Sequence, residues 1–204
     1  MSGSSSERPV VVLASANPDK VAELRELLGE RFDVQPRPAD LPDTIEDEDS
    51  LEGNAVKKAS EVAAATGAWA LADDTGLFVD ALDGRPGVYT ARYAGENASY
   101  EDNVDKLLVE LDGVDPDERT ATFRTVVALI GADGTGLTAE GTVEGYISAS
   151  RAGGRGFGYD PVFEPLEGAG RTFSEMSVEE KHEISHRSRA LNALDTALAQ
   201  SPLF

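Results

Sequence analysis

The most constraining stretch of this sequence is residues 69–79, where two carboxylates interrupt an apolar run. Residues 69–71 and 77–79 are apolar and of strand length, and the motif Asp-Asp-Thr-Gly occupies residues 73–76 between them. The pattern predicts two extended segments joined by a turn at the Thr-Gly pair, with both carboxylates exposed at a strand end. Adjacent residues of an extended backbone point to opposite faces, so one carboxylate must lead, and we assign that part to Asp74. For this motif alone, a plain Asp-Gly turn is the alternative.

The residue types available for metal binding are few. Carboxylate oxygens are ligands that a small divalent cation such as Mg²⁺ prefers, and a carboxylate beside such an ion can position or deprotonate a water. The chain has no cysteine and only two histidines, His182 and His186. This composition excludes disulfides and thiolate metal sites and leaves little for a zinc centre. Any metal is therefore expected to be bound by oxygen.

The formal net charge is −20, from 38 acidic and 18 basic residues. Such a field repels nucleic acid and anionic lipid, which argues against a nucleic-acid-binding or membrane-surface protein. A small anionic substrate bridged by a metal stays compatible with it. Because the hydrophobic content is a normal 40%, the acidity suggests a salty cytoplasm in which self-repulsion is screened.

The length of 204 residues suits one domain with a substantial core. We expect a flexible N-terminal tail over residues 1–8 and a single two-lobed domain over residues 9–204. No apolar run reaches the roughly 18 residues of a membrane span, and the start of the chain lacks the apolar centre of a signal peptide. These features predict a cytoplasmic protein.

A strand followed by a helix is expected to open the domain. Residues 10–13 are a β-branched run typical of a strand buried on both faces of a sheet. Asn17 and Pro18 are typical of a helix N-cap and first position, and the stripe that follows is Val21, Leu24, Leu27 and Leu28. Free N–H groups at this helix start, with Lys20 in the first turn, predict a phosphate site. An ordinary capped helix is the alternative.

A second helix is predicted from a capping box at Asp49 and Glu52 to Thr66-Gly67. Asn54 and Lys58 are four residues apart on it, so they share a face and can act together. Further elements expected from periodicity and caps are a short strand over 32–35, a helix over 99–111, a hairpin of strands over 120–130 and 137–147, a capping box at 177–180 and a last helix from Ser185.

The glycine-rich segment 153–161 contains Phe157, Gly158, Tyr159 and Asp160. Glycine on both sides of Phe157 lets a flat ring system approach the backbone and stack, a known way to hold a base. A plain turn is the alternative. Near the start of the last helix, the positions that can carry positive charge are Lys181, His186 and Arg187, which as isolated features are more typical of surface charges.

Six motifs occur in order along the chain: residues 15–20 (SANPDK), 54–59 (NAVKKA), 72–77 (ADDTGL), 86–93 (PGVYTARY), 156–161 (GFGYDP) and 184–187 (ISHR). Together they resemble the inosine triphosphate pyrophosphatases, also called XTP/dITP diphosphatases. The resemblance implies an elongated mixed α/β fold, with a twisted sheet flanked by helices and a nucleotide cleft between two lobes. It also implies a homodimer that uses Mg²⁺ to hydrolyse ITP, dITP or XTP to the monophosphate and pyrophosphate, which cleanses the nucleotide pool.

The resemblance also implies roles for single residues. Asp74 is expected to be the catalytic carboxylate and a metal ligand, with Asp73 beside it and Glu46 as a second metal ligand. Residues expected to bind the phosphates are Ser15, Asn17, Lys20 and Lys58, and Asn54 and Thr75 are expected to bind the substrate as well. Residues expected to hold the base are Phe157, Gly158, Tyr159, Asp160, Lys181, His186 and Arg187. Gly53 stands where the family usually has glutamate and Leu51 where it commonly has an aromatic residue, and we interpret both as packing changes.

Two other functions stay open at this point. A pyrophosphatase of the related septum-inhibitor family would act on pyrimidine or modified nucleotides. A nucleotide-sensing module would bind without turnover, although the Asp pair and the retained lysines favour catalysis.

Overall fold

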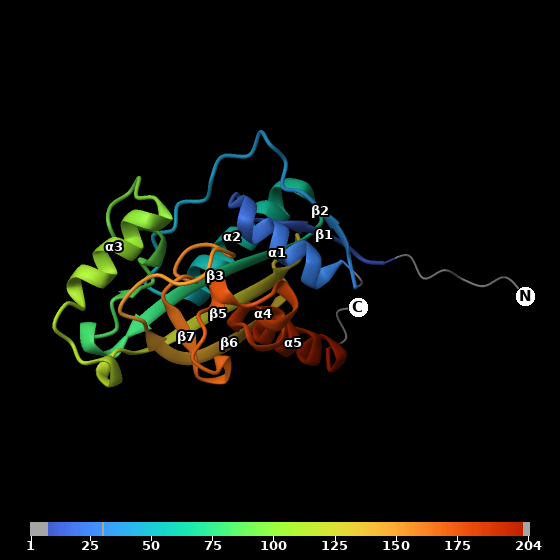
Figure 1. Ribbon diagram of the computed structural model, residues 1–204. Helices are drawn as coiled ribbons and strands as arrows, with labels where there is room; N and C mark the ends of the chain where they lie inside the picture. The colour runs from blue at the N-terminus through green and yellow to red at the C-terminus, as the bar shows by residue number, and fades with distance from the viewer. Residues whose placement is uncertain (1–7, 30, 202–204) are drawn as a thin grey trace, which may run out of the picture.

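The computed structural model describes residues 8–29 and 31–201, which form a mixed α/β fold (Figure 1). The described strands are β1 (Val10–Leu13), β2 (Asp33–Gln35), β3 (Trp69–Val79), β4 (Pro86–Gly87), β5 (Thr120–Ile130), β6 (Gly136–Ile147) and β7 (Phe163–Pro165). The described helices are α1 (Pro18–Leu28), α2 (Leu51–Thr66), α3 (Tyr100–Glu110), α4 (Val178–Ile184) and α5 (His186–Ala199).

All seven described strands belong to one sheet, in the order β2-β1-β3-β5-β6-β7, with β4 paired to β3. β1 runs parallel to β2 and β3, and the other pairs are antiparallel. The hairpin expected from the sequence is β5 and β6, in which Thr120 pairs with Tyr146 and Ile130 with Gly136. The mixed α/β fold with a long sheet flanked by helices is confirmed.

Helices cover both faces of the sheet because the strands alternate apolar side chains between them. One face packs against α2, with Val12, Ala72 and Val126 in its core. The opposite face packs against α1 and α5, with Leu13, Leu71 and Val127 in its core. Helix α3 lies apart at the left of Figure 1, over a third core that contains Val104, Leu107, Phe123 and Phe163.

Strand β3 corrects the prediction for the Asp-Asp motif. It is continuous from Trp69 to Val79, so the expected turn at Thr75-Gly76 is wrong. Thr75 and Gly76 stay extended because β5 pairs with them through Thr125 and Arg124, a long-range pairing that local composition does not show. The two carboxylates are therefore in mid-strand and buried, with exposed fractions of 1% for Asp73 and 5% for Asp74.

The helix starts follow the expected cap chemistry, with two corrections. Ser50, not Asp49, caps α2 by accepting from the Gly53 N–H, a shift of one residue. Asn17 caps α1 as predicted, and its Oδ1 accepts from the N–H groups of Asp19 and Lys20. The expectation of free N–H groups at this helix start is therefore wrong, because the cap already uses them.

The expected tail over residues 1–8 lies outside the described residues except for Arg8, whose guanidinium donates to the Gly29 carbonyl. Within the described part of the chain, no helix is long and apolar enough to cross a membrane.

Candidate active site

A cavity of about 340 Å³ opens between the start of α1, the middle of β3 and the loop before β7. Its volume lies in the range of small-molecule sites, roughly 300–1,000 Å³. The predicted site residues that line it are Ser15, Asn17, Lys20, Glu46, Lys58, Asp74, Thr75, Phe157, Gly158, Tyr159, Asp160, Lys181, His186 and Arg187. Two predicted residues, Asn54 and Asp73, are not part of the lining. Segments distant in sequence therefore converge on one cavity.

Asp74 faces α2, where the two residues predicted to act together meet it. Lys58 Nζ donates to Asp74 Oδ1 at 2.8 Å, and Asn54 Nδ2 donates to Asp74 Oδ2 at 3.3 Å. Lys58 Nζ also lies 2.8 Å from Glu46 Oε1. One ammonium group thus joins two carboxylates, and the side chain of Lys58 is only 9% exposed.

Because Lys58 pairs with both Asp74 and Glu46, each of the three groups has a shifted pKa. Burial opposes the charge of Lys58, but Asp74 and Glu46 outweigh it and raise the pKa of the ammonium group. Burial raises the pKa of Asp74, although Lys58 and Lys20 oppose the change. The pKa of Glu46 is lowered, because Lys58 outweighs the burial of this more exposed side chain. The raised pKa moves Asp74 in the direction that general-base chemistry uses.

The residues around Asp74 suit Mg²⁺. This ion takes one or two protein carboxylates and completes its shell with water and substrate phosphate oxygens. Asp74 and Glu46 both line the cavity and already lie on one shared cation, Lys58. Among the described residues no group of three or more histidine, cysteine or acidic side chains is arranged to hold a metal. A two-carboxylate set that water and substrate oxygens would complete fits the coordination of Mg²⁺.

Arg92 holds Glu46 in place, and Gly53 makes room for the segment that follows it. A Cβ at Gly53 would lie 2.9 Å from Glu48 Cβ, so glycine lets segment 46–50 approach α2 closely. Arg92 Nη2 donates to the Glu46 carbonyl at 2.9 Å, a role that the sequence did not suggest. Leu51, the other departure from the family, is buried in the core under α2, which agrees with a packing change.

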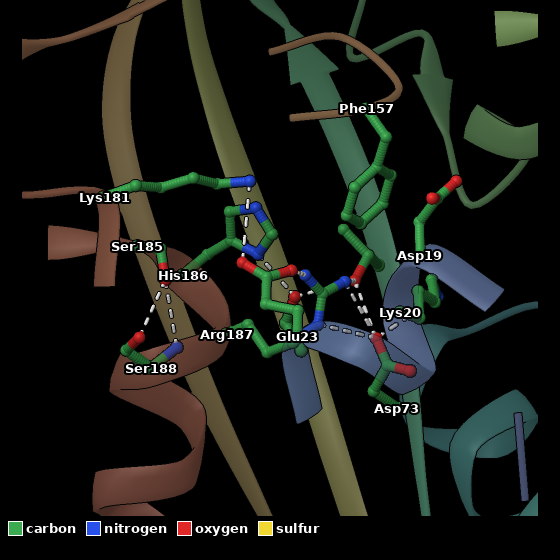
Figure 2. A network of polar contacts seen from close by, with 12 residues as sticks. Asp19, Lys20, Glu23, Asp73, Phe157, Lys181, Ser185, His186, Arg187 and Ser188 are labelled. Carbon is green, nitrogen blue, oxygen red and sulfur yellow. Dashed lines mark hydrogen bonds and ion pairs between the residues drawn. The ribbon is translucent and has the colours of Figure 1, made fainter. Parts of the chain in front are cut away.

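Asp73 points to the opposite face of β3, as strand alternation predicts, and meets a different set of cations (Figure 2). Arg187 donates to Asp73 Oδ2 from Nε at 3.2 Å and from Nη2 at 3.1 Å. Lys20 Nζ lies 3.2 Å from the same oxygen. Burial alone would raise the pKa of Asp73, but Lys20 and Arg187 hold it far below its usual range. Asp73 anchors cations at the cavity wall and does not line the cavity itself.

Glu23 completes this cluster, and sequence reasoning missed it. Its carboxylate pairs with the Arg187 guanidinium and lies 3.5 Å from Lys181 Nζ. Figure 2 shows Arg187 between Glu23 and Asp73. Burial opposes the charge, yet Arg187 and Lys181 lower the pKa of Glu23. The sequence signal that could have found it is its position: Glu23 directly precedes Leu24, which is on the buried stripe of α1, and an unpaired charge near a buried stripe would be costly.

Phe157 presents a half-buried ring to the cavity. Lys181 Nζ lies 5.1 Å and Arg187 Cζ 5.7 Å from its centroid. Asp160 holds the loop, because it accepts from Phe157 N at 2.9 Å and from Lys181 Nζ at 2.7 Å. Gly156 is needed beneath it, since φ is 74° there and an added Cβ would lie 2.1 Å from Asp160 Oδ2.

The remaining residues of the predicted base site, Tyr159 and His186, are both buried and already make hydrogen bonds within the protein. Tyr159 is 4% exposed, and its hydroxyl donates to the Thr90 carbonyl, so its role is mainly in the core. His186 stacks on Phe123 and pairs through Nδ1 with the Thr125 hydroxyl at 2.6 Å. Burial lowers the pKa of His186 well below its usual value, and Arg187 and Lys181 add to the effect. His186 is therefore a neutral ring at the cavity wall.

Comparison with known proteins identifies the family. The Ham1 family matches residues 11–197. A protein named dITP/XTP pyrophosphatase from Shouchella clausii is 44% identical, over 90% of this chain and 93% of its own length. Another of that name, from Geobacter sulfurreducens, is 48% identical, over 90% and 94%. The solved HAM1 protein from Coxiella burnetii superposes with a TM-score of 0.84 at 39% identity, over 95% of this chain and 100% of its own.

The family match covers nearly the whole described domain, and the solved relative shares both its fold and more than a third of its sequence. The resemblance carried by the six motifs is thereby confirmed. This chain belongs to the Ham1 family.

Proposed function

We propose that this chain, a nucleoside triphosphate pyrophosphatase by its family, hydrolyses ITP, dITP and XTP to the monophosphate and pyrophosphate with Mg²⁺. One observation carries the proposal: Asp74 shares a cavity with the ammonium groups of Lys20 and Lys58 and with the aromatic ring of Phe157. The relatives named dITP/XTP pyrophosphatase support the substrate class.

The phosphate end of the cavity combines a base with several cations. Bound at Asp74 and Glu46, Mg²⁺ would neutralise charge that develops on the phosphate oxygens. Lys20 and Lys58 reach the cavity from α1 and α2 and would bind the same triphosphate. Asp74, with its pKa raised by burial, would orient the attacking water at the α-phosphorus and accept its proton.

The base end favours purines with an oxygen at position 6. Hypoxanthine and xanthine present an acceptor there, whereas adenine presents an amino donor. Lys181 and Arg187 already donate to carboxylates, so His186 is the freer donor. His186 offers a donor to the base when Nδ1 accepts from the Thr125 hydroxyl, since the ring proton is then on Nε2, for which the described residues show no hydrogen-bond partner. Adenine would leave that donor unpaired, and such polar mismatches discriminate strongly.

The test is a substrate panel of ITP, dITP, XTP, ATP, GTP and dUTP with Mg²⁺, read as pyrophosphate released. We expect kcat/KM for the first three to exceed that for ATP by at least about 100-fold, as polar discrimination allows. Preference for a pyrimidine nucleotide would favour the septum-inhibitor alternative. Tight ITP binding without pyrophosphate would favour a nucleotide-sensing module.

Homodimer formation and a cytoplasmic location also belong to this proposal. The absence of cysteine agrees with a reducing compartment but does not require one. Light scattering at several protein concentrations tests the dimer, and a constant monomer mass would contradict it.

A further inference from the structure

Tyr100 contacts two of the predicted site residues, Asn17 and Phe157, although none of the six sequence motifs includes it. It is the first residue of α3 and lines the cavity. Its hydroxyl accepts from Asn17 Nδ2 at 2.8 Å and donates to Asp19 Oδ2 at 3.1 Å. Its ring centroid lies 5.8 Å from that of Phe157, with the planes tilted by 38°. One side chain thus contacts both residues 15–20, which we call the phosphate loop, and the ring of Phe157, which we call the aromatic wall.

The hydroxyl contact and the helix cap together fix the orientation of the Asn17 amide. Asn17 Oδ1 is used by the helix cap, where it accepts from Asp19 N at 3.0 Å and Lys20 N at 3.3 Å. Nδ2 carries two hydrogens, and Tyr100 takes one of them. The second has no partner among the described residues, and Asn17 lines the cavity. This hydrogen is available to a phosphate oxygen.

The ring contact narrows the cavity at its base end. Tyr100 as a whole residue is 38% exposed, and Phe157 comes from a loop 57 residues further along the chain. Offset and tilted ring pairs at this separation are favourable, and more so once water is excluded. A nucleotide lying from Lys20 to Phe157 would pass Tyr100 with its sugar, so the ring can cover the bound nucleoside.

We propose that Tyr100 is a substrate-positioning residue that couples the phosphate loop to the aromatic wall. Its hydroxyl orients Asn17 toward the triphosphate, and its ring closes with Phe157 over the nucleoside. The inference rests on the proposed function, because it assumes that a nucleoside triphosphate occupies this cavity.

Two substitutions separate the two contacts. Tyr100→Phe removes only the hydroxyl, and we expect KM for ITP to rise about five-fold, the value of one neutral hydrogen bond. Tyr100→Leu removes the ring as well, and the expected rise is about 30-fold, since the aromatic pair adds to the loss. In both variants kcat should stay within about three-fold of the wild type, because uniform binding is what is lost.

The inhibition constant of inorganic pyrophosphate is a measurement that should stay unchanged if Tyr100 has a merely structural role. Tyr100→Phe should weaken its inhibition about five-fold through Asn17, by the same hydrogen-bond value. Tyr100→Leu should weaken it no further, because pyrophosphate has no nucleoside for the ring to cover. Val109→Ala is the matched control: Val109 is on the same helix, 73% exposed, and outside the cavity. Its KM should equal that of the wild type.

The inference is overturned if Tyr100→Leu leaves KM for ITP within two-fold of the wild type, or if either variant lowers kcat alone. Calorimetric titration with ITP supplies the same ratios as dissociation constants, so the inference stays testable in the absence of turnover. Failure of the wild type to release pyrophosphate refutes the proposed function. Unchanged ITP affinity in the variants refutes the role of Tyr100.

Discussion

The same isosteric change to asparagine should affect the two adjacent aspartates of β3 differently: at Asp73 it should lower stability, and at Asp74 it should lower activity. Asp73→Asn removes the charge that Arg187 and Lys20 share, and the Arg187 side chain is only 2% exposed. Breaking a buried ion pair by removing one partner costs about 3–5 kcal/mol. We expect the lower end, about 3 kcal/mol, because Glu23 still pairs with Arg187. For a protein of this length, that lowers Tm by about 6–12 °C.

Asp74→Asn should cost less stability than Asp73→Asn, about 1 kcal/mol, the central value for point substitutions. Burial raises the pKa of Asp74, so the folded state holds this charge at a cost that a neutral amide avoids. Lys58 keeps Glu46 as its partner. Activity should instead fall by about 100- to 10,000-fold with the loss of the base.

The two variants are measured side by side. Denaturant unfolding gives the change in the free energy of unfolding, and pyrophosphate release from ITP at low temperature gives the activity of the folded fraction. The reasoning is refuted if Asp74→Asn loses as much stability as Asp73→Asn, or if it keeps full turnover.

Three further predictions concern the base wall, the buried histidine and the surface charge. Phe157→Ala should raise KM for ITP about ten-fold with little change in kcat, as expected for a stacking contact worth 1–3 kcal/mol; steady-state kinetics checks this, and an unchanged KM would count against stacking. Folding keeps His186 neutral, because its pKa is far below the unfolded value near 6.5, so stability should be full above that pH and fall by up to about 1.4 kcal/mol per unit as the pH drops further. His186→Gln should remove this part of the slope in urea unfolding between pH 4.5 and 6.5, about the range below the unfolded pKa, and His182→Gln, at the partly exposed histidine, should keep it; equal slopes in the wild type and His186→Gln would contradict the assignment. With a net charge of −20, stability should rise as KCl is increased to about 2 M, where charge screening is nearly complete, and equal unfolding midpoints in low and high salt would contradict the expectation of a salt-adapted protein.

Local rules predicted what depends on neighbouring residues. The cap at Asn17 follows from a side chain that can accept N–H groups two and three residues on. The shared face of Asn54 and Lys58 follows from helical periodicity, and both do meet Asp74. Strand alternation placed Asp73 and Asp74 on opposite faces even though the turn expected beside them does not exist.

What the sequence did not show depends on contacts between distant segments. Thr75 and Gly76 are extended because β5, about 50 residues away in the chain, pairs with them. Glu23 pairs with Arg187, which is 164 residues further along. Tyr100 reaches Asn17 across 83 residues and looks like an ordinary helix residue in the sequence. Lys181 and Arg187 line the cavity as expected, but the sequence did not show that each also binds a buried carboxylate from a distant segment.

The reaction products test the central claim most directly, namely that Asp74, Lys58 and Lys20 act on one bound triphosphate. ITP is hydrolysed with Mg²⁺ in water labelled with heavy oxygen, and the products are analysed by mass spectrometry. Attack at the α-phosphorus predicts pyrophosphate without label and inosine monophosphate with one labelled oxygen, both lost in Asp74→Asn. Orthophosphate, label in the pyrophosphate, or equal turnover by Asp74→Asn would contradict the account.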